Sequence, residues 1–459
     1  MKGVFMKRKF ALFTAGLFLI VFAFAGCFGG QPEESASVDI NVSEDIKEVE
    51  NLQKQVKQQS EQLQVMQSNL KIKKASKTAG STEEVKKLEQ AIVVQQNEIV
   101  QTSKKVTTIK AEKGKYIWAM FRSVPSHDFF NGYNITPPLD FKWKFKSIAG
   151  GFKASPVMDA ENIYVGSTDA NFYAIEKGTG VKAWNTQCTG PISSSAALYG
   201  NALYFGTEAG YFYALSPSTG KVLWSKKLGG PVQSSSPAVY AGTVYIGCMD
   251  NNVYAMNRST GDIIWKFATQ APVVSSPIIS NGMVYIGSID TNMYALDVDS
   301  GKVVWQYAAS KSIASTAAES EGTLIFGSDD KKIYAVNALN GNVKWAFQAD
   351  GWITAGVIKD GVFFTGSNDR NVYAISGDSG KLLWKTPCEG KVMTTPFIVN
   401  NLIYIAAGKE VMALDTKTGE KKWSQKYDYN INTSIIGEDA VIYFGDTDSS
   451  FYALETTAK

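Results

Sequence analysis

The side chains that most often carry catalysis are scarce in this 459-residue chain and stand far apart. His127 is the single histidine, which argues against a histidine-based triad or a histidine-rich metal site. Four cysteines occur at separate positions, and no phosphate-binding loop, nucleophile elbow or Cys-x-x-Cys pair is present. The net charge of +3 rules out a strongly basic nucleic-acid binder. The sequence therefore predicts no catalytic residue, no metal site, no cofactor and no nucleic-acid partner.

Residues 1–27 have the pattern of a secretory signal. Basic residues precede an uncharged apolar run from Phe10 to Gly26, which is short for a membrane-spanning helix. The run ends in small residues before Cys27 and resembles a bacterial lipoprotein signal, in which that cysteine is lipidated. An uncleaved anchor with an incidental Cys27 is the alternative. Both interpretations place the protein outside the cytoplasm on a membrane, either the outer membrane or the cell surface. Residues 28–42 are expected to be a flexible tether.

Residues 43–112 carry an apolar heptad repeat in two halves, which predicts a coiled-coil arm. The first half repeats an apolar residue at Val49, Val56, Leu63 and Leu70. After a break around Gly80, the second half does so at Val85, Ile92, Ile99 and Val106. An antiparallel hairpin within one chain and a parallel dimer both fit the pattern. The arm is either a spacer or a surface that binds a partner, and self-association through residues 43–112 is one such possibility.

From residue 141 onward the chain repeats with a period of about 40 residues. Each unit has four short apolar runs separated by turn residues, which is typical of a β-propeller blade. A Tyr-Ala pair and a turn glycine recur in step with one tryptophan per unit. We expect each largely buried indole to dock its blade on the neighbouring blade, a structural role. The tryptophans are Trp143, Trp184, Trp224, Trp265, Trp305, Trp345, Trp384 and Trp423.

The number of strands predicts eight blades over residues 141–459. The first three strands of a blade occur eight times, but the fourth occurs only seven times after its own set. The missing strand lies upstream at residues 141–145, so this strand is predicted to complete the last blade and close the ring. The predicted fold class is an all-β, eight-bladed β-propeller of four-stranded blades, preceded by an α-helical coiled-coil hairpin. Residues 113–140 form a lead-in.

The repeat over residues 294–305, Tyr-Ala-Leu-Asp-x-x-Ser-Gly-Lys-x-x-Trp, resembles that of propellers of the pyrroloquinoline-quinone (PQQ) type. The segment from Trp118 to Arg122, with Pro125 and His127, is similar to the lead-in of that family. The seventh repeat departs from it, because residues 405–410 have a shortened turn and no Tyr-Ala pair. A lipoprotein signal before such a propeller is similar to the outer-membrane β-barrel assembly lipoproteins. That resemblance implies a non-catalytic, membrane-anchored scaffold that binds proteins, in outer-membrane or envelope assembly.

The same resemblance offers a quinone-dependent dehydrogenase as the alternative function. Those enzymes carry an adjacent pair of cysteines, calcium ligands and an aspartate base in long loops. Here Cys188, Cys248 and Cys388 are isolated, and no repeat has an insertion long enough to cover an active site. We therefore expect the protein not to be an enzyme. A sensor or a glycan-binding module outside the cytoplasm is a further alternative.

Aspartates recur in the turns between the second and third strands of the units, at Asp169, Asp250, Asp290, Asp330, Asp369 and Asp448. A ring of carboxylates could hold cations or a basic partner, but Asp-x-Asn favours stabilisation of each local turn. The same face is predicted to carry two aromatic residues, Phe152 and Trp352, where the other units have Ile or Val. These two are the candidate contacts for a protein partner.

Overall fold

The computed structural model describes residues 81–113 and 135–457, together with individual helical positions between residues 51 and 73. The predicted signal, Cys27, the tether and most of the lead-in, residues 114–134, lie outside the described residues. None of the helices described is long and apolar enough to cross a membrane.

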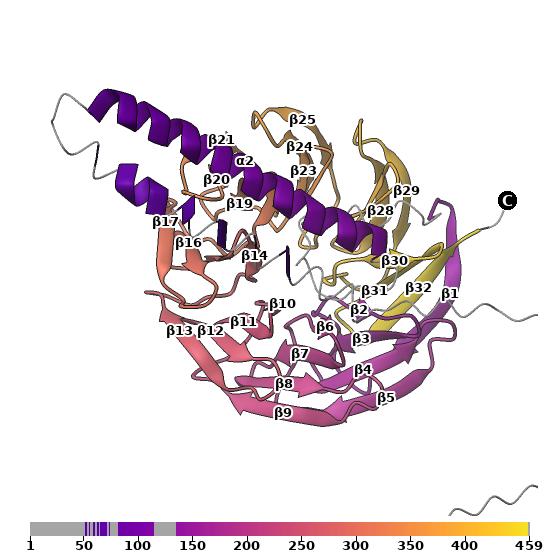
Figure 1. Cartoon of the computed structure of the whole chain (residues 1–459). Helices are drawn as coiled ribbons and strands as arrows, with labels where there is room; N and C mark the ends of the chain where they lie inside the picture. Colours follow the sequence, from indigo (N-terminus) through magenta and orange to yellow (C-terminus); the bar gives the residue numbers. More distant parts are fainter. Residues whose placement is uncertain are drawn as a thin grey trace, which may run out of the picture. The chain divides into compact units, whose positions relative to one another are not determined.

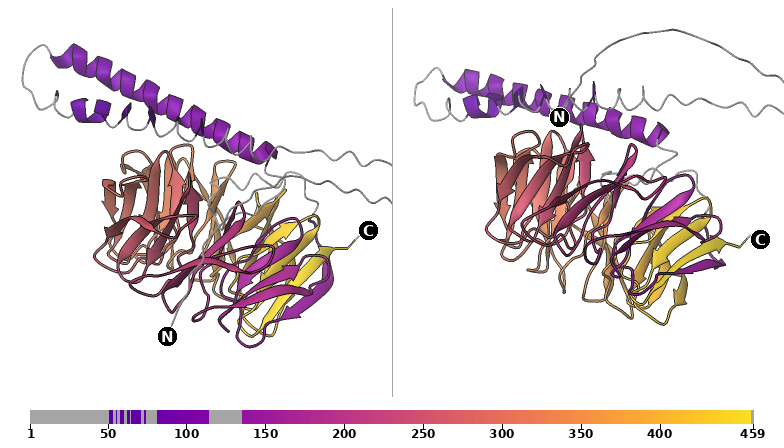
Figure 2. Two further views of the ribbon diagram at one scale, coloured as in Figure 1. Left: turned by 60° about the horizontal axis from the view of Figure 1, so that its bottom comes forward. Right: turned by 90° about the horizontal axis from the view of Figure 1, so that it is seen from below.

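The arm is helical where the structure describes it. The described positions from 51 to 73 are helical, and helix α2 runs from Ser81–Lys113, where the sequence predicts its second coil (Figure 2). Lys73 Nζ lies 2.7 Å from Glu84 Oε2 across the break between the two helical stretches. Leu63 and Ile92 from the two predicted seams are buried in one apolar cluster.

The propeller consists of eight four-stranded antiparallel sheets, the blades (Figure 1). Their strands are named A to D from the axis outward, because the first strands of neighbouring blades contact one another. Blade one is β2 (Val157–Met158), β3 (Asn162–Gly166), β4 (Asn171–Glu176) and β5 (Lys182–Gln187). Blade two is β6 (Ala197–Tyr199), β7 (Ala202–Gly206), β8 (Tyr211–Leu215) and β9 (Val222–Lys227). Blade three is β10 (Ala238–Tyr240), β11 (Thr243–Cys248), β12 (Asn252–Asn257) and β13 (Ile263–Ala268). Blade four is β14 (Ile278–Ser280), β15 (Met283–Gly287), β16 (Asn292–Asp297) and β17 (Val303–Ala308).

The other four blades have the same order of strands. Blade five is β18 (Ala318–Ser320), β19 (Thr323–Gly327), β20 (Lys332–Asn337) and β21 (Val343–Gln348). Blade six is β22 (Val357–Lys359), β23 (Val362–Gly366), β24 (Asn371–Ser376) and β25 (Leu382–Pro387). Blade seven is β26 (Phe397–Val399), β27 (Leu402–Ala407), β28 (Glu410–Asp415) and β29 (Lys421–Lys426). Blade eight is β30 (Ile436–Glu438), β31 (Val441–Gly445), β32 (Ser450–Thr456) and, as its D strand, β1 (Leu139–Lys146).

The first and last strands of the ring are paired, at the position that the strand count predicts. Strand β1 runs antiparallel to β32, and Figure 1 shows the magenta and yellow strands side by side. Lys142 Nζ lies 2.6 Å from Glu455 Oε2 across this pair. The buried Ile135, just before β1, packs with Phe397 and Tyr404 of blade seven. Residues from the N-terminal side therefore complete both blade eight and its contact with blade seven.

The apolar core lies between the blades. Strands B and C present almost wholly buried residues, while D strands alternate between exposed and partly buried positions, as in β13. In the seventh blade, the irregular repeat forms a tight hairpin in which Ala407 pairs with Glu410 and Gly408 has φ 61°. Glu410 is buried there and lies 2.9 Å from Lys421 Nζ. The departure seen in the sequence is thus a local change of turn inside an intact blade.

Candidate functional site: the axial cavity and the contacts that shape it

Each blade docks on the next through its tryptophan. The indole Nε1 of Trp305, in blade four, donates a 2.9 Å hydrogen bond to Ala338 O in the C–D turn of blade five. Trp423, in blade seven, packs against the cluster around Tyr404. The six other indoles donate likewise: Trp143 to Lys177, Trp184 to Pro217, Trp224 to Arg258, Trp265 to Val298, Trp345 to Gly377 and Trp384 to Thr416. The structure thus places these predicted residues at the contacts between blades.

The backbone carbonyl that accepts a hydrogen bond from the indole also accepts one from a tyrosine hydroxyl. This tyrosine lies in the same blade as the tryptophan. Tyr285, in strand B of blade four, donates a 3.0 Å hydrogen bond to Ala338 O. Burial raises the pKa of Tyr285 well above its ordinary value, so the hydroxyl stays protonated and remains a donor. The same pairing joins Tyr204 to Arg258 and Tyr245 to Val298. One turn carbonyl therefore fixes two side chains of the preceding blade.

The turn glycine provides the space that the indole fills. Gly341 has φ 73°, and a Cβ built on it would lie 2.7 Å from Trp305 Cε3. The equivalent glycines, all with positive φ, meet the indole of the preceding blade in the same way: Gly180, Gly220, Gly261, Gly301, Gly380 and Gly419. The glycine and tryptophan columns of the sequence are therefore two halves of one contact.

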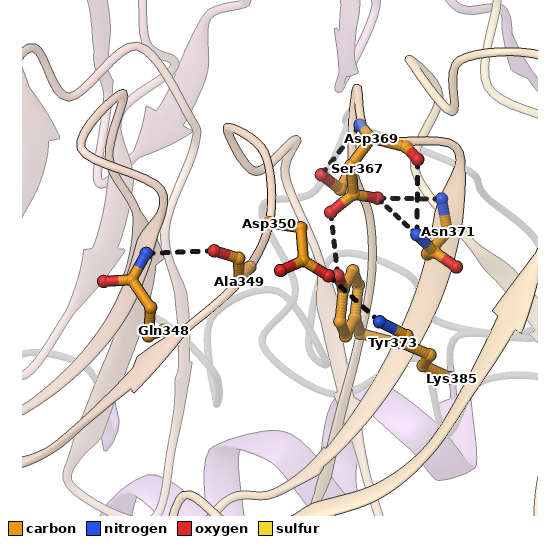
Figure 3. Close-up of polar contacts among 8 residues, drawn as sticks. All are labelled: Gln348, Ala349, Asp350, Ser367, Asp369, Asn371, Tyr373 and Lys385. Atoms are coloured by element: carbon orange, nitrogen blue, oxygen red, sulfur yellow. Dashed lines mark hydrogen bonds and ion pairs between the residues drawn. The ribbon is translucent and has the colours of Figure 1, made fainter.

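The recurring aspartates are used inside the blades. In blade six, Asp369 accepts hydrogen bonds from Asn371 N at 2.9 Å and from Tyr373 OH at 2.7 Å (Figure 3). Tyr173, Tyr254, Tyr294 and Tyr334 donate to Asp169, Asp250, Asp290 and Asp330 in the same way. In blade eight the role falls to Asp446, whose carboxylate accepts from Tyr452 OH at 2.9 Å, and not to the predicted Asp448. The spacing Asp-x-x-x-Tyr was the signal in the sequence for this contact.

Asp290 shows the electrostatics of these turns. Burial raises the pKa of its carboxyl, but hydrogen bonds from Gln270 N, Asn292 N and Tyr294 OH outweigh burial and lower the pKa below its ordinary value. Because Gln270 lies in the connection that leads into strand A, the carboxylate ties two loops of one face together. These carboxylates are already occupied by local donors, so the structure favours the turn-stabilising interpretation over a cation ring.

A belt of hydroxyl groups joins the A strands around the axis. The backbone N–H of Ser155 donates to Ser195 Oγ at 2.8 Å, and Ser236 N donates to Ser276 Oγ at 2.9 Å. The remaining links of the same kind run from Ser195 to Ser236, Ser276 to Thr316, Thr395 to Ser434 and Ser434 to Ser155. The belt satisfies backbone groups that strand pairing within one blade leaves over.

Blade six interrupts the belt. Strand register places Ala355 where the other blades carry Ser or Thr. Its neighbour in the belt, Thr395 of blade seven, is 3% exposed, and its Oγ1 has no hydrogen-bond partner among the residues the structure describes. A buried hydroxyl left without a partner costs free energy, so this position stands out from the otherwise satisfied ring.

An axial cavity of about 1030 Å³ lies inside the belt. Its walls are mostly serine and threonine, and its charged residues are Lys153, Lys311 and Asp329. Burial raises the pKa of Asp329, while the nearby Lys311 opposes that shift. Pockets of this size are ordinary for small ligands.

The two aromatic residues predicted as partner contacts do not share one position. Phe152 is fully buried against Gly445 of blade eight, so the prediction that it is an exposed contact is wrong. Ile353, and not Trp352, fills the equivalent place against Gly327, because the D–A connection of blade six is one residue shorter than that of blade five. Trp352 is displaced from the column and lies, partly buried, on the wall of the axial cavity.

The three described cysteines are free thiols in different blades. Burial raises the pKa of Cys188, Cys248 and Cys388 to about 12, so each is an inert protonated thiol at neutral pH. Within the described part of the chain, no group of three or more His, Cys, Asp or Glu side chains could hold a metal ion.

The chain matches the model of the family described as outer membrane protein assembly factor BamB. The match covers residues 78–237, 213–350 and 347–457. No sequence among the curated proteins matches the chain.

Solved structures share the fold at low sequence identity. BamB from Moraxella catarrhalis has 16% identity and a TM-score of 0.61, over 69% of this chain and 99% of that one. A europium-containing methanol dehydrogenase has 14% identity and a TM-score of 0.63, over 76% and 99%. A quinohemoprotein alcohol dehydrogenase from Comamonas testosteroni has 14% identity and a TM-score of 0.62, over 77% and 83%. These likenesses show an eight-bladed fold of the PQQ type. They do not show the function.

Proposed function

Because the chain belongs to the family of outer membrane protein assembly factor BamB, we propose that it is a non-catalytic scaffold that binds other proteins in outer-membrane or envelope assembly. The proposal includes attachment to a membrane outside the cytoplasm. The observation that carries it beyond family membership is an apolar surface on one face of the propeller.

This surface lies on the D–A connections, which all reach the same face of the ring. Ile148 is 71% exposed in the connection that enters blade one, and Tyr429 is 47% exposed in that of blade eight. Met393 is 42% exposed in that of blade seven, and Trp352 stands partly exposed in that of blade six. Four consecutive blades thus each offer a large apolar side chain, which we call the apolar arc. Exposed apolar groups that cluster in this way are typical of protein contacts.

A quinone-dependent dehydrogenase fits the residues less well. The three described cysteines lie in blades one, three and six, so no adjacent pair is formed. Among the residues that the structure describes, Asp329 is the one acidic side chain on the cavity wall, whereas a calcium ion bound with the quinone needs several oxygen ligands. Addition of PQQ and calcium to the purified protein is expected to give no bound chromophore, and a stable new absorption band would overturn this view.

We further propose that Cys27 is the site of lipid attachment and that residues 43–112 form an arm between the membrane and the propeller. The change Cys27→Ser should release the protein from the membrane fraction if the cysteine carries the lipid. Retention of the variant in that fraction would support an uncleaved anchor instead. Self-association through the arm predicts that deletion of residues 43–112 lowers the oligomeric state, which sedimentation measures.

The scaffold proposal is tested on the apolar arc. The double change Ile148→Asp and Tyr429→Asp should abolish the recovery of proteins crosslinked to the propeller in intact membranes. Leu223→Asp is the matched control, because Leu223 is 52% exposed on the outer strand β9 and lies outside the arc. Equal crosslinking of the arc variant, the control and the unchanged protein would sink the proposal that this face is the binding surface.

A further inference from the structure

The belt of hydroxyl groups around the axial cavity is broken at one position, in blade six. Seven of the eight belt positions carry a hydroxyl, and Ala355 is the exception. In the other links the backbone N–H of one belt residue donates to the hydroxyl of the next blade, as Thr395 N donates to Ser434 Oγ at 3.0 Å. Beside Ala355 this link is not made, and Thr395 Oγ1 is buried without a partner among the described residues. A second cavity hydroxyl, Ser193 Oγ, also has no partner among the described residues. Because a buried hydroxyl is expensive to leave unpaired, these groups point to a ligand that pairs with them.

An aromatic side chain lines the same cavity. Trp352 lines the cavity from blade six, which also contributes Ala355, and Thr395 lines it from the next blade. An indole offers a flat apolar face, and the unpaired hydroxyl offers a donor and an acceptor. A ligand that fits both groups must therefore combine an apolar face with hydroxyl groups at its edge.

The charges of the cavity limit the ligand further. Lys311 and Asp329 carry opposite charges and interact with each other. The described wall therefore has one further charge, the positive charge of Lys153. A ligand with several negative charges would find few cations here, while a neutral ligand with many hydroxyl groups would meet serine and threonine around most of the wall. The cavity volume of about 1030 Å³ accommodates a ligand of one or two sugar rings.

We propose that the axial cavity of this propeller binds a short neutral saccharide, with one sugar ring against Trp352 and a sugar hydroxyl paired with Thr395 Oγ1. The site shares Trp352 and Met393 with the apolar arc. The arc is tested on Ile148 and Tyr429, which do not line the cavity, and the saccharide is also tested on Thr395, which is not part of the arc, so failure of one proposal can be told from failure of the other.

The test is binding of cellobiose and of N,N′-diacetylchitobiose to the full chain, measured by saturation-transfer NMR and by titration calorimetry. Transfer should be strongest to the ring protons that pack on the indole. The change Trp352→Leu should lower the affinity about tenfold or more, because it removes the stacking face. Absence of binding by both disaccharides, or binding that Trp352→Leu leaves unchanged, would overturn the proposal.

Two further variants separate a ligand contact from a structural role. Thr395→Val removes a hydroxyl that has no partner within the described part of the chain, so it should lower affinity about tenfold without lowering the melting temperature. Ser275→Ala removes a buried hydroxyl that donates to Gly287 O at 2.7 Å and accepts from Gly287 N at 2.9 Å, and this hydroxyl does not line the cavity, so the change should lower the melting temperature and leave affinity unchanged. The reverse pattern, in which Thr395→Val lowers stability and keeps full binding, contradicts the proposal.

Discussion

Gly301 lies directly against the indole of Trp265, and a Cβ built on this glycine would stand 2.6 Å from Trp265 Cε3. The glycine belongs to blade four and the tryptophan to blade three, so the contact joins neighbouring blades. Gly301 also has φ 66°, a conformation that residues with a Cβ adopt only at a cost. Two independent constraints therefore act on the same residue.

Three glycine variants separate these constraints. Gly301→Ala places a Cβ against the indole and also puts a residue other than glycine at positive φ. It should lower the free energy of unfolding by about 2–5 kcal/mol. Gly242→Ala tests the backbone constraint alone, because φ is 86° and no atom lies within 4 Å of a built Cβ. It should lower the free energy of unfolding by about 1–2 kcal/mol. Gly178→Ala meets neither and should change stability by less than about 0.5 kcal/mol. Urea denaturation measures the order, and equal losses in Gly301→Ala and Gly242→Ala would show that the indole contact is unimportant.

The Asp290 turn predicts a dependence of stability on pH. Asp290→Asn removes a charged acceptor of four hydrogen bonds and should lower the free energy of unfolding by about 1–3 kcal/mol at pH 7. Because the folded-state pKa of Asp290 lies below its ordinary value of 3.8, this stability is present above that value and is lost as the pH falls through the folded-state pKa. The variant and the original protein should therefore converge in acid.

Denaturation at several pH values from 7 down to about 2 measures this difference, because the loss begins only below 3.8. Asp448→Asn is the control, since Asp448 is exposed and its carboxylate takes no part in the tyrosine contact of blade eight. That control should stay within about 0.5 kcal/mol of the original protein. A difference for Asp290→Asn that does not shrink in acid would contradict the assigned role of the carboxylate.

Glu319 predicts the opposite slope. It is buried in β18 and accepts a hydrogen bond from Gly322 N, and burial raises the pKa of its carboxyl above 4.5. The folded state therefore holds this proton more tightly, and stability falls as the pH rises from 4.5 through the folded-state pKa. Glu319→Gln keeps an acceptor and carries no charge, so it should gain stability relative to the original protein across that window. A relative stability that stays flat with pH would refute the prediction.

Ile135 predicts the strength of the contact between blades seven and eight. Tyr404 OH donates to Ile135 O at 3.2 Å, as Tyr285 donates to a C–D turn elsewhere in the ring, and the Ile135 side chain packs against Gly437. Ile135→Ala should lower the free energy of unfolding by about 2–5 kcal/mol. Ile148→Ala is the control, because Ile148 is 71% exposed and should cost less than about 0.5 kcal/mol. Calorimetry that finds the two variants equally stable would show that Ile135 does not secure the ring.

Much of the fold could be predicted from the sequence because the same contact is repeated. The tryptophan and glycine columns are constrained in every blade by one local geometry, so their spacing reveals the strand order and the missing strand at Phe141. The aspartate turns are visible for the same reason, although Asp446 replaces Asp448 in the blade that the two chain ends share.

The features of the candidate site were harder to predict because they are exceptions to the repeat. Ala355 lacks the hydroxyl that its equivalents carry. It is recognised as the equivalent position only from the strand register around the axis. Trp352 was aligned with Phe152 by sequence, but a connection shortened by one residue moves it to the cavity wall. Burial of Phe152 follows from the neighbouring blade, which local sequence does not contain.

The pairing of β1 with β32 also determines when the molecule can become whole. Lys142 and Glu455, which meet across these strands, are 313 residues apart, so a ribosome makes β1 long before its partner exists. Until β32 is available, blade eight lacks the strand that lies between β1 and β31, and β1 is an unpaired edge. A chain exported in an extended form would meet the same condition on the far side of the membrane. Completion of the ring therefore requires that the chain has arrived as far as β32.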